Sequence, residues 1–239
     1  MCTVTYLPLD NDNFILTSSR DVSPNRKVAD FPREFKTKNG KICFPKDGEA
    51  GGTWIGTNET GRTVVILNGA FESHKMSPPY RKSRGLVVRD ILEANDFWDC
   101  IQHYNFNGVE PFTLLILDWF DLFEFWELIW DGERKYLKQL DTAIPIIYSS
   151  STLYDETMRQ KRQKWFDGWL EKNPNYSQAD TLDFHERAGE GNIEESVFMK
   201  RSYVETVSIT SIYKQKEAAK WFYHDVKTDS FYQDYFELD

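Results

Sequence analysis

Met1-Cys2-Thr3-Val4-Thr5-Tyr6-Leu7 opens the chain and places a cysteine directly behind the initiator methionine. Removal of that methionine would leave Cys2 with both a thiol and the chain's free α-amine. The thiol is a nucleophile, and an α-amine with a pKa of about 7.7–8 can take its proton near neutral pH. One residue would then supply both the attacking group and the base. The alternative is that Cys2 is a small core residue at the start of a strand.

The residues after Cys2 are expected to form a β-hairpin. Residues 2–7 have the alternation of a strand, residues 10–13 are turn formers, and residues 14–17 return as a second strand. Residues 18–32 are polar and contain two prolines, so we expect a loop there.

The rest of the chain alternates blocks of strands with blocks of helices. Strands are expected at 42–44, 54–55, 63–67, 112–117, 123–130, 135–140, 144–149, 204–213 and 219–226, and helices at 84–95, 97–104, 152–171 and 180–188. Segregated blocks of this kind favour helices stacked on antiparallel sheets. No linker or internal repeat divides the sequence, so residues 1–239 are expected to form a single domain.

Composition excludes several classes of protein. The net charge of −9 over 239 residues argues against a nucleic-acid partner, because that affinity comes from Lys and Arg that neutralise phosphates. The longest apolar stretch, residues 112–117, is far shorter than the roughly 20 residues of a membrane helix. The three cysteines are widely spaced and form no CxxC pair, so we expect neither disulfides nor a zinc site, and a cytoplasmic location.

Three further motifs follow the Met-Cys start at characteristic positions. They are Arg20-Asp21, Gly51-Gly52-Thr53-Trp54-Ile55-Gly56 and Arg84-Gly85-Leu86-Val87. Together the four motifs resemble the NRDE family, the family of transport and Golgi organisation protein 2, from residue 2 to about residue 228. The glycine–tryptophan motif is the most specific of them. The choloylglycine-type amidases are more distant relatives.

The resemblance implies the fold of the N-terminal-nucleophile hydrolases. That fold is of the α+β class, a four-layer αββα sandwich in which two antiparallel sheets lie between helix layers. It agrees with the block order of strands and helices in the sequence.

The resemblance also implies a set of catalytic roles at the start of the chain. Cys2 would be the nucleophile, Arg20 would stabilise its thiolate, and Asp21 would hold the α-amine by a charge-assisted hydrogen bond. The three side chains are then expected to converge to within about 3–5 Å. The alternative for Arg20 and Asp21 is a surface ion pair at the start of a loop.

A ligand pocket is implied beside these residues. Asn68 resembles a family position whose amide stabilises a developing oxyanion, although a residue before Gly69 is also a natural turn former. Gly52 would let the chain pass close to a ligand, or would serve only as a turn. Trp54 would face the same pocket, or would simply pack in the core.

The sequence departs from the family pattern at three places. The signature Asn-Arg-Asp-Glu is here Ser19-Arg20-Asp21-Val22. Ser150-Ser151 stands where relatives carry an asparagine, which leaves the Ser151 hydroxyl as a shorter donor. Val207 falls where relatives carry an arginine. Losing an amide donor and a cation would weaken stabilisation of the transition state by several kcal/mol.

Two functions follow from this combination. The first is a cysteine amidohydrolase that cleaves a linear C–N amide bond of a small molecule. The second is an intracellular carrier on the same fold, since the resemblance links the family to handling of haem or a lipid-like metabolite. No residue is an obvious haem ligand, Cys2 being the only nearby thiolate candidate, and no cofactor or metal is expected. The four histidines are scattered along the sequence: His74, His103, His185 and His224.

Two other polar groups are interpreted as structural. His185-Glu186 is expected on the surface, because no second histidine follows at metal-ligand spacing. Four acidic residues recur at intervals of three, and we interpret them as the solvent side of irregular strands rather than as a cation site. They are Asp118, Asp121, Glu124 and Glu127.

Overall fold

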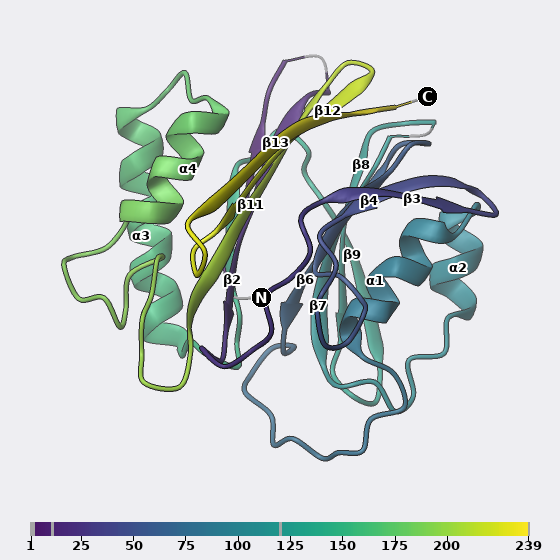
Figure 1. Ribbon diagram of the computed structural model, residues 1–239, viewed down its shortest axis with the longest axis horizontal. Helices are drawn as coiled ribbons and strands as arrows, with labels where there is room; N and C mark the ends of the chain where they lie inside the picture. Colours follow the sequence, from purple (N-terminus) through teal and green to yellow (C-terminus); the bar gives the residue numbers. More distant parts are fainter. Residues whose placement is uncertain (1–2, 11, 120, 239) are drawn as a thin grey trace.

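The computed structural model describes residues 3–10, 12–119 and 121–238. Cys2 lies outside the described residues. Two antiparallel sheets face each other, with α3 (Glu156–Lys172) and α4 (Gln178–Arg187) outside one sheet and α1 (Arg84–Glu93) and α2 (Phe97–His103) outside the other (Figure 1). This is the αββα sandwich that the sequence predicts.

The first sheet contains both ends of the described chain. Its strands lie in the order β10-β1-β2-β11-β12-β13. Their bounds are β1 (Thr3–Pro8), β2 (Phe14–Val22), β10 (Ile146–Ser149), β11 (Glu205–Gln215), β12 (Ala218–Asp225) and β13 (Ser230–Glu237). Strand β1 therefore lies between β10 and β2, and Thr3 pairs with Ser149 on one side and Ser19 on the other.

The second sheet follows the chain order without a crossover, β3-β4-β5-β6-β7-β8-β9. Its strands are β3 (Arg33–Thr37), β4 (Gly40–Phe44), β5 (Ile55–Asn58), β6 (Arg62–Asn68), β7 (Phe112–Asp118), β8 (Glu124–Trp130) and β9 (Lys135–Leu140). Gly40 has a φ of +117° in the turn between β3 and β4, a conformation that side chains other than glycine rarely adopt.

The main core fills the space between the two sheets. Alternation along β1 turns Val4 and Tyr6 inward, where the Tyr6 ring lies 4.5 Å from that of Phe125 on the second sheet. The same alternation turns Leu7 outward against the helices, where it joins Phe166 of α3. The two faces of one strand thus bury their side chains in separate clusters.

The N-terminal hairpin is longer than the sequence predicts. Strand β2 continues to Val22, so the expected loop at 18–32 is wrong over its first residues. Ser18 and Ser19 are polar but fully buried, because β2 is hydrogen-bonded to β1 on one side and β11 on the other. Strands β3 and β13 were also not expected from the sequence.

His185 is buried and not on the surface as the sequence predicted. It lies on the face of α4 toward the first sheet, where its ring contacts Thr5 Oγ1 (2.9 Å) and Ser19 Oγ (2.8 Å). Burial, and then the charge of Arg162, lower the pKa of His185 to about 3. The neutral imidazole joins α4 to two strands.

The described helices are all too short or too polar to cross a membrane.

Candidate active site

A cavity of about 390 Å³ opens between the two sheets at the end of β2 and β6. Four residues chosen from the sequence lie on its wall: Arg20, Gly52, Trp54 and Asn68. Other parts of the wall come from the loop before β5, the N-terminus of α1 and Glu110. The structure therefore brings together residues that are far apart in the sequence.

Arg20 is a buried cation on this wall. Its guanidinium donates to the Asp47 carboxylate and lies over the Trp54 ring, 4.1 Å from the ring centroid. Burial lowers the pKa of Arg20, and the nearby Asp47 charge opposes that shift. An arginine remains protonated under these conditions. The cavity wall thus carries a fixed positive charge.

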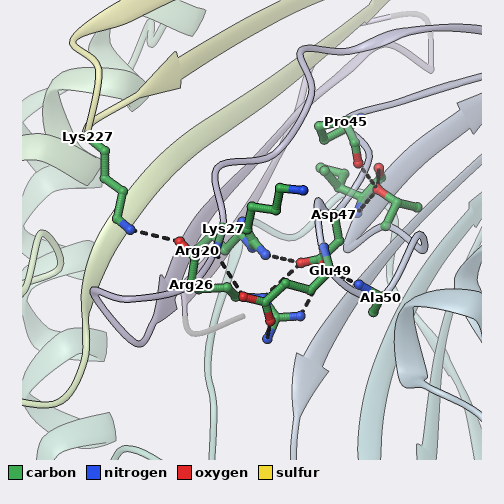
Figure 2. Close-up of polar contacts among 10 residues, drawn as sticks. Arg20, Arg26, Lys27, Pro45, Asp47, Glu49, Ala50 and Lys227 are labelled. Atoms are coloured by element: carbon green, nitrogen blue, oxygen red, sulfur yellow. Dashed lines mark hydrogen bonds and ion pairs between the residues drawn. The ribbon is translucent and has the colours of Figure 1, made fainter.

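The Asp47 carboxylate is the shared hydrogen-bond acceptor of the loop before β5, as Figure 2 shows. Besides Arg20, its carboxylate accepts from Arg26 Nε and Nη2, each at 2.9 Å, and from the N–H groups of Glu49 (3.0 Å) and Ala50 (2.7 Å). Burial disfavours the charged carboxylate, yet the Arg26 hydrogen bond, the Ala50 N–H and the Arg20 charge together lower the pKa of Asp47. Asp47 therefore fixes both arginines and the loop.

Gly52 is required by close contact between two backbone segments. A Cβ at residue 52 would lie 2.4 Å from the carbonyl carbon of Gly85, in the first turn of α1. Thr53 N donates to Gly85 O in the same crossing (3.1 Å). The two glycines let the loop lie directly on the helix terminus, which brings α1 to the edge of the cavity.

Asp21 faces away from Arg20, on the opposite side of β2. Its carboxylate accepts from the Tyr154 hydroxyl (2.9 Å) and from the Thr206 hydroxyl (2.6 Å), and the residue is 2% exposed. Adjacent residues in a strand point to opposite faces, so the side chains of Arg20 and Asp21 lie in different environments. The expected convergence of both with Cys2 stays a prediction, because Cys2 lies outside the described residues.

Asn68 and the serine pair meet at a second, smaller hollow of about 200 Å³. Asn68 lies on the walls of both cavities, whereas Ser151 lies on the second alone. The Ser150 hydroxyl donates to Asn68 O (2.7 Å), and the Ser151 hydroxyl donates to Glu72 O (3.3 Å). Both serine hydroxyls thus have a backbone carbonyl as an acceptor, and Ser150 Oγ also lies 2.9 Å from Thr152 Oγ1.

Val207 lies where the pairing of β11 with β2 shifts register, between Thr206 and Ser208. Its side chain is 5% exposed and apolar. Its side chain therefore contributes no donor or charge to the site.

The remaining candidates from the sequence have structural surroundings. Asp118 is not on the solvent side as the sequence predicted: it is buried and bound to Arg62 Nε at 2.6 Å, so its charge is compensated inside the protein. Among the residues that the structure describes, no cluster of histidine, cysteine and acidic side chains has the geometry of a metal site. Burial raises the pKa of the Cys43 and Cys100 thiols, so both are poor nucleophiles at neutral pH.

Several residues around the site gave little signal in the sequence. Asp47 precedes a glycine-rich loop, and such a position is common for aspartate in ordinary turns. Tyr154 and Thr206 lie 133 and 185 residues from Asp21, and no local pattern joins them to it. Three-dimensional contacts were needed to find all three.

Residues 1–217 match the model of the family Transport and Golgi organisation 2. The chain belongs to this family. Its membership confirms the resemblance that the four sequence motifs indicate. No curated protein matches this chain.

Solved structures of N-terminal-nucleophile hydrolases are similar to this family member in fold. An N-acylethanolamine-hydrolyzing acid amidase ortholog from Caenorhabditis elegans is 11% identical, with a TM-score of 0.60 over 88% of this chain and 92% of that chain. A variant of conjugated bile acid hydrolase from Clostridium perfringens is 10% identical, with a TM-score of 0.59 over 99% and 92%. Penicillin V acylase from Agrobacterium tumefaciens is 10% identical, with a TM-score of 0.60 over 100% and 86%. At these identities the likeness shows the fold alone.

Proposed function

We propose that this protein is a cysteine amidohydrolase whose nucleophile is Cys2 after removal of Met1. The substrate is a small molecule with a linear amide bond that enters the cavity beside Arg20. The observation that carries the proposal is the position of the buried Arg20 cation on that wall, one residue along β2 from Ser19, the pairing partner of Thr3. Cys2 is bonded to Thr3, so their Cα atoms lie about 3.8 Å apart.

The reaction proceeds in two steps through an acyl-enzyme. The Cys2 sulfur attacks the amide carbonyl carbon and forms a C–S bond, while the α-amine takes the thiol proton. That proton passes to the leaving nitrogen as the C–N bond breaks and the amine departs. Water then cleaves the thioester, which releases a carboxylic acid and restores the thiol.

Charges and donors on the wall have separate roles in this scheme. Arg20 favours the thiolate, because a nearby cation lowers a thiol pKa. Asp21 holds the α-amine on the other side of β2. The Asn68 amide donates to the oxyanion of the tetrahedral intermediate, and Gly52 and Trp54 bound the space for the substrate.

A carrier of haem or a lipid-like metabolite is the second candidate. It is favoured by the hydroxyls of Ser150 and Ser151, which already have backbone carbonyls as acceptors and are therefore less available to stabilise an oxyanion. Val207 adds no charge to replace the family arginine. A protein with this site would retain a ligand in the cavity and turn it over slowly.

A panel of amide substrates separates the two functions. Wild type and Cys2→Ala are incubated with N-acyl amines, acyl-homoserine lactones and penicillin V, and ligands that the purified proteins retain are identified by mass spectrometry. Turnover by wild type that Cys2→Ala abolishes is expected. A ligand retained equally by both proteins, with no turnover by either, would instead establish the carrier.

Thiol reactivity gives an independent prediction. At neutral pH, iodoacetamide should alkylate Cys2 at least about tenfold faster than Cys43 or Cys100, whose thiol pKa values are raised by burial. Arg20→Gln should slow the Cys2 reaction, whereas Arg33→Ala, which removes an exposed surface charge, should not. Equal rates at the three cysteines in peptide mapping would count against an activated thiol.

A further inference from the structure

A fully buried arginine lies beneath the start of the chain, outside the residues of the proposed reaction. Arg162 of α3 is 0% exposed and donates to Thr3 Oγ1 and to the carbonyl oxygens of Glu195 (3.1 Å) and Ser196 (2.5 Å). These acceptors are uncharged, and Arg162 Nε has no hydrogen-bond partner among the described residues. A buried cation with only neutral partners is costly, which points to a role beyond packing.

Tyr154 connects this cation to Asp21. The Arg162 guanidinium lies over the Tyr154 ring, 3.6 Å from its centroid, and the Tyr154 hydroxyl donates to Asp21 Oδ2 (2.9 Å). The tyrosine is 1% exposed, so water competes little with either contact. A cation against the ring makes the phenol a stronger donor, and a hydrogen bond to a charged carboxylate is among the stronger ones in proteins.

We propose that Arg162 and Tyr154 are positioning residues that hold Asp21 and the start of β1 in place for the α-amine of Cys2. Arg162 acts on the strand through Thr3 and on the carboxylate through Tyr154. This inference rests on the proposed function, and it adds two residues that the family motifs do not contain.

The arrangement lowers the pKa of the α-amine, so a larger fraction of it is unprotonated and able to accept the thiol proton at neutral pH. The Tyr154 hydrogen bond takes up part of the Asp21 charge, which weakens the hold of that carboxylate on an ammonium group. The positive charge of Arg162 disfavours the ammonium form directly.

Other charged and titratable groups face this network from every side. His185 on α4 is neutral because of burial and the Arg162 charge. Arg201 lies 5.4 Å from the Tyr154 ring centroid, and the Glu195 carboxylate is bound to Lys161. Arg20 is on the opposite face of β2. In Tyr154→Phe none of these charged groups is removed, so a change in the amine titration reports the lost hydroxyl. Arg162→Met also removes the Arg162 charge from His185, which burial alone still keeps neutral.

The test is the pH dependence of α-amine acetylation by dilute acetic anhydride, followed by mass spectrometry of the N-terminal peptide. Tyr154→Phe keeps the ring and removes only the hydroxyl. It should raise the apparent pKa of the amine by about one pH unit, because a hydrogen bond to a charged group is worth about 1.5–3 kcal/mol. Arg162→Met should shift it in the same direction, and Arg162→Lys should restore most of the wild-type value.

Tyr6→Phe is the matched control. It removes a buried hydroxyl from β1 itself, where Tyr6 donates to Thr142 O (2.6 Å), and should leave the amine titration unchanged. If Arg162→Met does not fold, the α-amine pKa of Tyr154→Phe compared with that of Tyr6→Phe still tests the positioning role. An unchanged titration in Tyr154→Phe would overturn the positioning role and leave the proposed hydrolase standing. Retention of Met1 in the intact mass would overturn both.

Discussion

Replacing Asp47 with alanine is expected to lower the free energy of unfolding by about 3–5 kcal/mol, because it leaves the buried Arg20 cation without its carboxylate. The side chains of Arg20 and Asp47 are only 5% and 8% exposed, so water cannot replace the lost partner. The loop also loses the acceptor for the N–H groups of Glu49 and Ala50. Urea denaturation followed by tryptophan fluorescence measures the change.

Glu49→Ala is the matched control for Asp47→Ala. Glu49 pairs with the same Arg26 at 3.3 Å, but its side chain is 46% exposed, so its removal should cost less than about 1 kcal/mol. The difference in unfolding free energy between wild type and Asp47→Ala should also depend on pH. The pKa of Asp47 is held below its ordinary 3.8, so its contribution is complete above that pH and is lost as the pH falls through the folded-state value. Equal losses for Asp47→Ala and Glu49→Ala would refute the role of Asp47.

Replacing Asn68 with alanine is expected to reduce kcat by about 100- to 1,000-fold for any amide that the wild type hydrolyses, the loss typical of one oxyanion donor. The residue lies on the cavity wall at the end of β6, and in the proposed reaction its amide donates to the oxyanion. KM should change little, because a donor that acts mainly on the oxyanion contributes little to ground-state binding.

Ser151→Ala provides the comparison for Asn68→Ala. The Ser151 hydroxyl donates to Glu72 O, so its loss should reduce kcat by less than about tenfold. A larger loss in Ser151→Ala than in Asn68→Ala would exchange the roles of the two residues. Equal kcat in wild type and Asn68→Ala would remove Asn68 from the mechanism.

Much of the fold could be predicted because local patterns and long-range pairing agree. The apolar run at β6 and the stripe of α3 are visible in the sequence, and both formed close to the expected bounds. The sequence prediction ended the second strand at residue 17 because Ser18 and Ser19 are polar, and polar residues usually indicate a loop. Their burial depends on β11, nearly 190 residues later, which a local pattern cannot report.

The sequence predicted residues of the cavity wall but not the residues that hold them in place. Arg20, Gly52, Trp54 and Asn68 were found from motifs, and the structure places all four on one cavity wall. The supporting groups escaped notice because each has a common structural interpretation on its own. Asp47 resembles a turn residue, and Tyr154 has no motif around it. The burial of His185 was missed because its two hydroxyl partners lie on strands that are distant in the sequence.

The intact mass of the natively expressed protein decides whether Cys2 can be the N-terminal nucleophile. An N-terminal nucleophile needs a free α-amine on Cys2, which exists only after Met1 is removed. We predict a single species whose mass lacks one methionine, with Cys2 at its N-terminus by peptide sequencing. A protein that retains Met1 in full would contradict this prediction, because the amine would then belong to the wrong residue.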